Sequence, residues 1–219
     1  LEKHGFKEMI ATLCYMPDSI RDYFTDGSEF GCEMSYSIED VPLGTAGSVK
    51  KLGKFTDETF VVISGDALTD TDLTKAVEYH KKNGASATIV LTKVSNPLEY
   101  GVVITDAEGR INRFLEKPSW GEVFSDTVNT GIYILEPEVM ELFEEGREFD
   151  FSKNLFPMML ENKMPLYGYV ADGYWCVECF ELQQVYNLIC LLCRYLVDDS
   201  AVLDGSHLSF CLVAHCIMF

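Results

Sequence analysis

The feature that most constrains the fold is an unbroken apolar run that ends abruptly in a glycine and an aspartate. Thr59 to Ser64 reads Thr-Phe-Val-Val-Ile-Ser, and Gly65 and Asp66 follow directly. Such a run predicts a strand buried on both faces, as in the sheet of an α/β protein. Ligands of open α/β sheets bind at the carboxyl ends of the strands, where Asp66 is expected. Its carboxylate could hold a divalent cation against a phosphate, or could cap a turn.

Strand and helix patterns alternate along most of the chain. Apolar alternation and apolar runs predict strands at 7–14, 32–38, 60–64, 86–93, 127–135 and 166–171, with a hairpin formed by 101–105 and 110–115. Helical periodicity and caps predict helices at 17–24, 70–83, 137–144, 151–162 and 182–196. This order predicts an α/β fold with a mostly parallel sheet, to which the hairpin adds an antiparallel element. Past about Asp198 the pattern decays.

Composition excludes several classes of partner. The formal net charge is −18, which argues against a nucleic-acid or anionic-membrane surface, because both require a basic face. No run approaches the roughly 18 apolar residues of a membrane span. The chain starts with Leu1 rather than Met and has no apolar leader, so we expect an N-terminal truncation and a cytoplasmic protein.

The eight cysteines favour reduced thiols in a cytosolic chain rather than a disulfide framework. The spacing Cys176-x-x-Cys179 followed by Cys190-x-x-Cys193 could form a tetrahedral zinc site. The second pair lies in an apolar, helix-like run without turn residues, which favours buried, inert thiols.

Two stretches after predicted strands combine groups suited to phosphates or bases. In Leu43-Gly44-Thr45-Ala46-Gly47, glycines at a helix start allow close approach of a base or a phosphate, or belong to an ordinary loop. Asp70-Thr71-Asp72 is a D-x-D element of the type that glycosyltransferases use for a metal-bound sugar nucleotide. Helix capping is the better explanation, with Asp70 as the N-cap and Asp72 at the positive end of the helix dipole.

Two further stretches are suited to sugars. Glu116 and Lys117 end a predicted strand before Pro118, and both could contact one ligand only if the strand ends there. A carboxylate that accepts sugar hydroxyls beside an ammonium paired with phosphate would suit a sugar phosphate; an exposed ion pair is the alternative. In Asp126 to Gly131, Asn129 and Thr130 offer amide and hydroxyl groups beside a glycine, or simply begin a strand.

The order of these stretches resembles the sugar-1-phosphate nucleotidyltransferase family. The resemblance rests on Pro-Leu-Gly-Thr-Ala-Gly at 42–47, Ser-Gly-Asp-Ala-Leu at 64–68, Tyr-Gly-Val-Val at 100–103, Glu-Lys-Pro at 116–118, Asn-Thr-Gly-Ile-Tyr at 129–133 and Gly-Tyr-Trp-Cys at 173–176. It covers roughly Leu1 to Trp175, and Phe114 to Glu138 is most similar to the prokaryotic mannose-1-phosphate guanylyltransferase branch.

The resemblance implies a Rossmann-like, three-layer (GT-A-like) nucleotidyltransferase fold with a mixed, mostly parallel sheet that lacks its first strand and phosphate loop. We therefore expect an incomplete nucleotidyltransferase domain over residues 1–180 and a C-terminal helix with a divergent tail over 181–219. The implied reaction joins an NTP, GTP by this resemblance, to a sugar 1-phosphate such as mannose 1-phosphate, with release of pyrophosphate. The implied partners are these small molecules; a homo-oligomer remains open.

The resemblance also implies roles for individual residues. Asp66 would bind Mg²⁺ and, with Lys117, act in catalysis. Leu43, Gly44, Thr45, Ala46 and Gly65 would contact the nucleotide. Gly101, Glu116, Lys117, Asn129 and Thr130 would bind the sugar phosphate.

Two departures from the family pattern bear on activity. The family begins with a strand and a glycine-rich loop carrying a basic residue, and it follows Trp-Cys with an aspartate that is the second metal ligand. This chain has Val177 at that position, and Glu178 would point to the other face of a regular strand. We therefore expect impaired turnover. The alternative is a non-catalytic, sugar-nucleotide-binding regulatory subunit.

Overall fold

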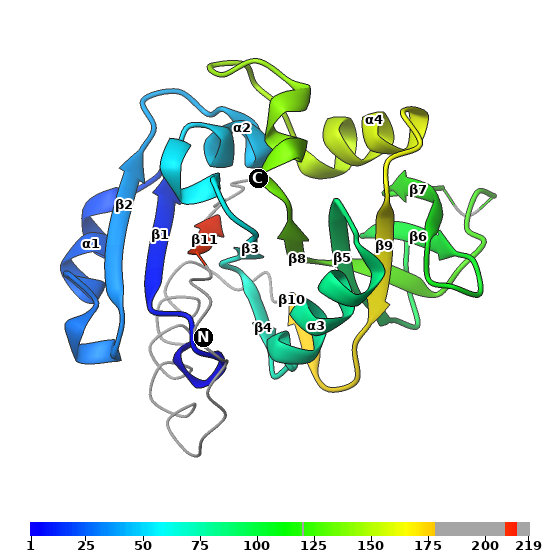
Figure 1. Cartoon of the computed structure of the whole chain (residues 1–219), viewed down its shortest axis with the longest axis horizontal. Coiled ribbons are helices and arrows are strands. Elements are labelled where there is room, and N and C mark those ends of the chain that lie inside the picture. The colour runs from blue at the N-terminus through cyan, green and yellow to red at the C-terminus, as the bar shows by residue number, and fades with distance from the viewer. Residues whose placement is uncertain (120, 178–208, 214–219) are drawn as a thin grey trace.

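The computed structural model describes residues 1–119, 121–177 and 209–213, which fold around one mixed sheet (Figure 1). Within these residues the strand order is β2-β1-β11-β3-β8-β5-β9, with β6 beside β8 and β7 beside β6. The strands are β1 (Glu8–Leu13), β2 (Glu33–Ile38), β3 (Phe60–Ser64), β5 (Ala87–Lys93), β6 (Gly101–Thr105), β7 (Ile111–Glu116), β8 (Thr127–Leu135), β9 (Leu166–Val170) and β11 (Ser209–Val213). A separate two-stranded sheet joins β4 (Ala67–Thr69) to β10 (Trp175–Val177).

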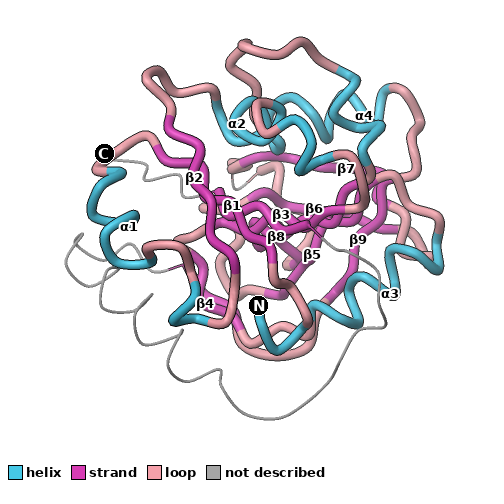
Figure 2. The backbone as a smooth tube through the Cα atoms, turned by 60° about the vertical axis from the view of Figure 1, so that its left-hand side comes forward, coloured by secondary structure: helices cyan, strands magenta, loops and turns pink. Residues whose placement is uncertain are grey.

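Helices cover both faces of the large sheet. The α-helices are α1 (Pro17–Phe24), α2 (Gly44–Lys50), α3 (Leu73–Asn83) and α4 (Phe156–Glu161). Short 3₁₀-helices span Glu2–His4, Ser28–Phe30, Gly53–Thr56 and Pro137–Leu142, and a π-helical turn spans Phe151–Leu155. Figure 2 places α2 and α4 on one side of the sheet and α3 on the other.

Strand β3 explains how the three layers hold together. Phe60 and Val62 belong to the core that includes Ala46 and Val49 of α2 and Phe156 of α4. The alternate residues Val61 and Ile63 belong to the core that includes Leu73, Ala76 and Val77 of α3. Both faces are buried, so this strand reads as a continuous apolar run. The predicted three-layer α/β architecture is confirmed.

The sheet contains more antiparallel pairing than the sequence predicted. Strand β8 runs antiparallel to both β3 and β5, whereas β1, β2, β11 and β3 are parallel neighbours and β5 is parallel to β9. The chain reaches β8 from the β6–β7 hairpin rather than through a helical crossover, and antiparallel neighbours need no crossover. The register of β5 against β8 shifts between Ile89 and Leu91, so β8 is irregular near Asn129.

Strand β11 comes from the predicted tail, yet it lies inside the sheet. It pairs in parallel with β1 on one side (Ala11 with Leu212) and with β3 on the other (Ile63 with Leu212). From the sequence alone, this segment was expected to belong to a divergent tail without assigned structure. The expected boundary at residue 180, the helix at 182–196 and most of the proposed zinc ligands lie outside the described residues. In the part of the chain that is described, no helix is long and apolar enough to cross a membrane.

The position of β11 between two strands leads to a stability prediction. Replacing Cys211 by proline removes a backbone donor from a central strand, so it should destabilise the protein by about 3 kcal/mol or more. The free energy of unfolding in urea measures this. Glu145→Pro is the matched control, because Glu145 is exposed and precedes Gly146, whose φ of 77° suits a turn that accepts proline. Equal stability of the two variants would contradict the placement of β11.

Candidate functional site

The carboxyl end of β3 meets the middle of β8, and this junction positions Asp66. Ser64 Oγ donates a hydrogen bond to Asp66 Oδ1 at 2.5 Å, and Asp66 is exposed. Gly131 has a φ of 77°, and a Cβ there would lie 2.9 Å from Ser64 Cβ. Only glycine therefore allows β8 to approach the end of β3 so closely. Gly65 lies in the turn between Ser64 and Asp66, at the edge predicted from the sequence.

Asn129 is the polar centre of the β8 segment. Its Oδ1 accepts from the Gly131 backbone N–H at 2.9 Å, and its Nδ2 donates to Tyr133 Oη at 3.0 Å and to Ser152 Oγ at 3.2 Å. Thr130 differs, because its buried hydroxyl donates to the Val90 carbonyl at 2.7 Å. The Thr130 hydroxyl thus joins two strands, and its role toward a sugar stays a prediction.

Glu116 and Lys117 stand where β7 ends. Glu116 is the last residue of β7 and pairs with Gly101 of β6, and a Cβ on Gly101 would lie 2.8 Å from Glu116 Oε2. Lys117 has a φ of 43°, unusual for a residue other than glycine, and is exposed. The regular strand therefore stops at Glu116. The sequence allowed Glu116 and Lys117 to contact one ligand only if the strand ends at this point, and that condition is met.

The loop Leu43–Gly47 docks against the backbone of Phe149. The Phe149 N–H donates to the Leu43 carbonyl at 2.8 Å, and its carbonyl accepts from the N–H groups of Ala46 and Gly47, each at 2.9 Å. A Cβ on Gly44 would lie 2.6 Å from the Phe149 carbonyl oxygen. The close neighbour that requires Gly44 is thus a protein backbone, and these two N–H groups of α2 are occupied.

Asp150 and Ser152 were not singled out from the sequence, although they connect the loop to β8. Asp150 Oδ2 accepts from Thr45 Oγ1 at 2.8 Å, and its Oδ1 accepts from the backbone N–H groups of Ser152 and Lys153 at 2.9 and 3.1 Å. Ser152 Oγ in turn accepts from Asn129. Asp150 is the N-cap of the π-helical turn, and an aspartate before a helical pattern was the available signal.

Burial and neighbouring charges shift the pKa of Glu116. Burial, and secondly the carboxylate of Asp150, raise the pKa of Glu116 above its usual value. Lys117, Lys153 and a hydrogen bond from Ser152 oppose this rise. Burial also raises the pKa of Tyr133 strongly, so its hydroxyl stays neutral. Asp150, Ser152, Asn129 and Glu116 thus form one polar cluster at the edge of the sheet.

The residues around Asp66 offer few groups that could bind a metal ion. Val177 pairs with Ala67 across β10 and β4, so position 177 lies next to Asp66 in the small sheet, but its side chain cannot bind a metal. Within the described residues, no group of three or more His, Cys, Asp or Glu side chains is arranged to hold a metal ion. One carboxylate and the Ser64 hydroxyl fit Mg²⁺ only when phosphate oxygens complete its coordination.

Asp72 of the D-x-D element is a helix cap. It is the N-cap of α3, and its Oδ1 accepts from the Lys75 backbone N–H at 3.2 Å. Capping therefore accounts for this element, but the cap is Asp72 and not Asp70, where the sequence placed it, because α3 begins only at Leu73. Asp70 instead binds the β10 segment, because its Oδ1 accepts from the Tyr174 backbone N–H at 2.6 Å.

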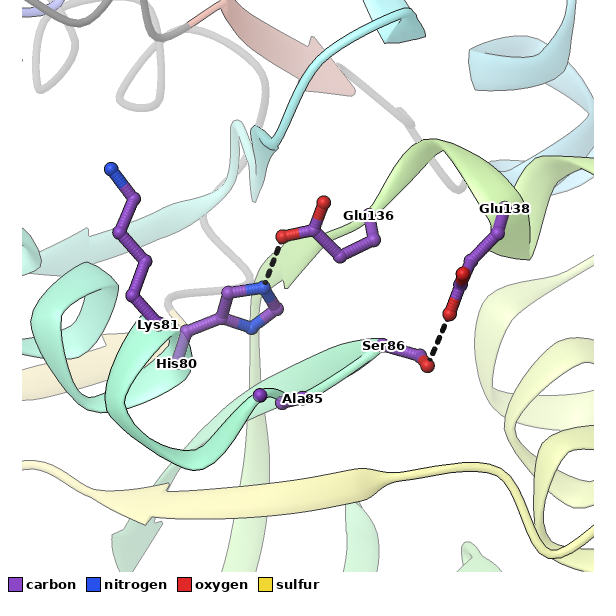
Figure 3. Close-up of a pocket in the computed structure, with 7 residues that line it drawn as sticks. His80, Lys81, Ala85, Ser86, Glu136 and Glu138 are labelled. Carbon is purple, nitrogen blue, oxygen red and sulfur yellow. Dashed lines mark hydrogen bonds and ion pairs between the residues drawn. The ribbon is translucent and has the colours of Figure 1, made fainter.

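A pocket of about 360 Å³ lies away from these residues (Figure 3). It opens where β8 ends and β5 begins, near the amino end of β3 and so at the edge opposite Asp66. There His80 contacts Glu136 Oε1 at 3.0 Å through Nε2 and Thr88 Oγ1 at 2.8 Å through Nδ1. Burial lowers the pKa of His80. These contacts tie α3 to β5 and β8, a structural role.

The chain matches the family model described as nucleotidyl transferase over residues 1–176. It therefore belongs to the nucleotidyl transferase family, as the order of motifs implied. Among the relatives, it is 41% identical over 189 residues to a UTP–glucose-1-phosphate uridylyltransferase of Synechocystis, an alignment that covers 80% of this chain and 49% of the relative. It is 35% identical over 173 residues to a mannose-1-phosphate guanylyltransferase of Mycobacterium tuberculosis, with 78% and 48% covered.

Solved structures agree on the fold. HddC from Yersinia pseudotuberculosis complexed with GMP-PN superposes with a TM-score of 0.70 at 24% identity, covering 87% of this chain and 80% of that one. A glucose-1-phosphate thymidylyltransferase described as putative, from Bacillus anthracis, also gives a TM-score of 0.70. The chain spans about half the length of the curated relatives it matches.

The cluster predicts a change in the titration of Glu116. Asp150→Asn removes a charge that raises the pKa of Glu116 and keeps one oxygen that can accept from the N–H groups of Ser152 and Lys153, so the pKa of Glu116 should fall. It should stay above the usual value, because burial is the larger cause. Carboxyl ¹³C NMR titration measures the shift, with the exposed Glu148→Gln as control. Because the pKa of Glu116 is higher in the folded state than in the unfolded state, ionisation of this carboxyl lowers the free energy of unfolding as pH rises from the unfolded-state pKa through the folded-state pKa. An unchanged Glu116 midpoint in Asp150→Asn would refute the cluster.

Proposed function

We propose that this chain carries the site of a sugar-1-phosphate nucleotidyltransferase, which joins an NTP to a sugar 1-phosphate and releases pyrophosphate. The observation that supports this most directly is the single line of contacts that connects Thr45, through Asp150 and Ser152, to Asn129. Glu116 lies in the same cluster. The loop that the family pattern assigns to the nucleotide is thereby held beside residues that it assigns to the sugar phosphate.

In this proposal each side chain performs a task suited to its chemistry. The Lys117 ammonium, exposed at the end of β7, pairs with the sugar phosphate, and the half-buried Glu116 accepts hydrogen bonds from sugar hydroxyls. The Asn129 amide keeps the β8 segment in place beside them. Asp66 holds Mg²⁺, which when bound would offset the repulsion between the two phosphates. A phosphate oxygen of the sugar then attacks the α-phosphorus of the NTP, in line with the departing pyrophosphate.

We propose GTP and mannose 1-phosphate as the substrates, with UTP and glucose 1-phosphate as the rival pair. Relatives with names of both kinds match the chain at similar coverage. The similarity of Phe114 to Glu138 to the mannose-1-phosphate branch supports the first pair. We also propose a cytoplasmic location: Cys14, Cys32 and Cys176 are free thiols, the state expected in a reducing compartment.

The second candidate is a regulatory subunit that binds the nucleotide sugar without turnover. Val177, where the family has its second metal ligand, favours it. Such a protein would use the same base loop and the same sugar contacts. It would bind GDP-mannose and form no product.

Turnover separates the two functions. The chain is incubated with Mg²⁺ and each pairing of GTP or UTP with mannose 1-phosphate or glucose 1-phosphate, and pyrophosphate and nucleotide sugar are quantified. We expect slow product formation that falls on the order of 100-fold in Lys117→Ala, because a charge that stabilises the transferring phosphates is lost. The exposed Lys82→Ala on α3 should change nothing. Binding of GDP-mannose without any product would instead establish the regulatory subunit, and absence of both would refute the proposed function.

Position 177 offers a gain-of-function test of the metal site. Val177→Asp adds a second carboxylate opposite Ala67, one residue along the chain from Asp66, so Mn²⁺ or Mg²⁺ should bind on the order of tenfold more tightly in the presence of nucleotide. Val170→Asp on β9, an exposed position, adds the same charge elsewhere and is the control. Metal titration by calorimetry or Mn²⁺ relaxation measures the affinity. Identical affinities in the two variants would show that Asp66 does not hold the metal.

A further inference from the structure

A π-helical turn lies between the loop assigned to the nucleotide and the residues assigned to the sugar. It spans Phe151–Leu155, and the carboxylate of its N-cap, Asp150, accepts from Thr45 Oγ1 at 2.8 Å. On the other side, Ser152 Oγ accepts from Asn129 Nδ2 at 3.2 Å. π-Helical turns are rare and often occur at functional sites. No residue of this turn was assigned to a ligand from the sequence, so its exposed side chains need an explanation.

The turn presents Lys153 to solvent from a fixed backbone. Phe151 and Leu155 on either side of it are 1% and 0% exposed, whereas Lys153 is exposed. Asp150 Oδ1 accepts from the Lys153 backbone N–H at 3.1 Å, and the Asp150 N–H donates to Asn154 Oδ1 at 2.8 Å. The core and the cap thus hold the backbone of Lys153, while its ammonium points away from the core.

Lys153 and Lys117 belong to different elements but act on the same carboxylate. Burial raises the pKa of Glu116, and both ammonium groups oppose that rise, so both lie within electrostatic range of Glu116. Among the residues that the structure describes, neither lysine takes part in an ion pair. The nearby Asp150 carboxylate accepts from the Thr45 hydroxyl and from two backbone N–H groups. Two ammonium groups therefore remain for an anionic ligand.

We propose that the Lys153 ammonium binds the α-phosphate of the nucleotide, while Lys117 holds the sugar phosphate. The inference rests on the proposed function, which brings these two phosphate groups together. Lys153 lies in the segment that Asp150 bonds to Thr45 of the nucleotide loop. Lys117 instead follows Glu116 at the end of β7, among the residues assigned to the sugar. Each cation is thus on the side of the site where its phosphate is expected.

The transfer of the nucleotidyl group explains the need for a second cation. The bond from the α-phosphorus to the sugar-phosphate oxygen forms as the bond to the bridging oxygen breaks, and the electron pair leaves with pyrophosphate. Negative charge is concentrated around the α-phosphorus during this step, and a cation placed there stabilises it. Lys153 keeps its proton throughout and acts only by its charge and hydrogen bond. Asp66 offers one carboxylate for a metal ion and Val177 offers none, so positive charge from side chains gains importance.

The test compares GTP, GDP, GMP and guanosine by calorimetric binding to the whole chain in the presence of Mg²⁺. The three nucleotides share the α-phosphate, and guanosine lacks it. We expect Lys153→Ala to weaken GTP, GDP and GMP by a similar factor, roughly 10-fold, because one charge-assisted hydrogen bond is lost. Guanosine should bind as before. The substitution keeps the backbone N–H that binds Asp150, so the turn keeps its cap.

Two further variants separate the charge from other effects. Lys153→Arg keeps the positive charge and should retain most of the affinity for all three nucleotides. Lys82→Ala removes an exposed ammonium from α3 and should change no affinity. Binding of mannose 1-phosphate is measured in the same variants, and Lys153→Ala should leave it unchanged.

The pattern of losses identifies the phosphate that Lys153 contacts. A loss for GTP and GDP that is absent for GMP would assign Lys153 to the leaving pyrophosphate, and a loss confined to mannose 1-phosphate would assign it to the sugar phosphate. Either result would overturn the inference, as would wild-type affinities throughout in Lys153→Ala.

Product formation separates this inference from the proposed function. If nucleotide sugar formed while Lys153→Ala bound every nucleotide normally, the proposed function would stand without the inference. If the expected losses occurred but no pairing of substrates gave product, the phosphate contact would stand and the transferase function would fail. Absence of nucleotide binding by the wild-type chain would overturn both.

Discussion

The backbone contact between Phe149 and the Leu43–Gly47 loop is the constraint on which the candidate site depends. It requires a residue without a side chain at position 44, because the Phe149 carbonyl occupies the space of a Cβ. It also uses the N–H groups of Ala46 and Gly47, which are therefore not available to a phosphate. Asp150 follows Phe149 directly, so the same contact sets its carboxylate between Thr45 and the Ser152 turn. The Leu43–Gly47 loop and the β8 segment around Asn129 thus form one hydrogen-bonded unit, and a shift in either would move the other.

Part of the fold and of the candidate site could be predicted from local sequence patterns. Strands β3 and β8 have the expected bounds, because a strand buried on both faces leaves a continuous apolar run in the sequence. The stop at Glu116 was also visible from its neighbouring residues, and an aspartate cap was expected for α3, although at Asp70 rather than Asp72. The Thr45–Asp150 bond joins residues 105 positions apart, and nothing in either neighbourhood indicates the other. Strand β11 was not predicted for a related reason, because a short apolar run has no periodicity that determines its partner strands. Nothing in the sequence distinguishes Glu39 from other polar residues, whereas the structure buries it and leaves one of its carboxylate oxygens without a hydrogen-bond partner.

Asp66 and position 177 are the two positions that bear on metal binding. The pairing of Val177 with Ala67 places the backbone of position 177 one residue from Asp66. The chemistry is reduced to one carboxylate and a hydroxyl, because valine offers no ligand atom. Mg²⁺ commonly binds through one or two carboxylates and substrate phosphates, so such a site would depend on the nucleotide to supply the rest. The metal ion and the nucleotide would then bind together rather than one after the other. A site of this kind would leave weak activity rather than none.

A net charge of −18 opposes the binding of a triphosphate, but the position of each charge matters more than the sum. At physiological salt, exposed charges farther apart than about 8 Å are largely screened, so distant carboxylates contribute little. Under the proposed function, the half-buried carboxylate of Glu116 faces neutral donors, the sugar hydroxyls. The exposed ammonium of Lys117 faces the phosphate. Its backbone has the left-handed φ of 43°, a conformation that costs about 1–3 kcal/mol and persists only where the surroundings impose it. The strain falls at a position where the proposed function needs a cation, so the strained turn and the charge arrangement support the same site.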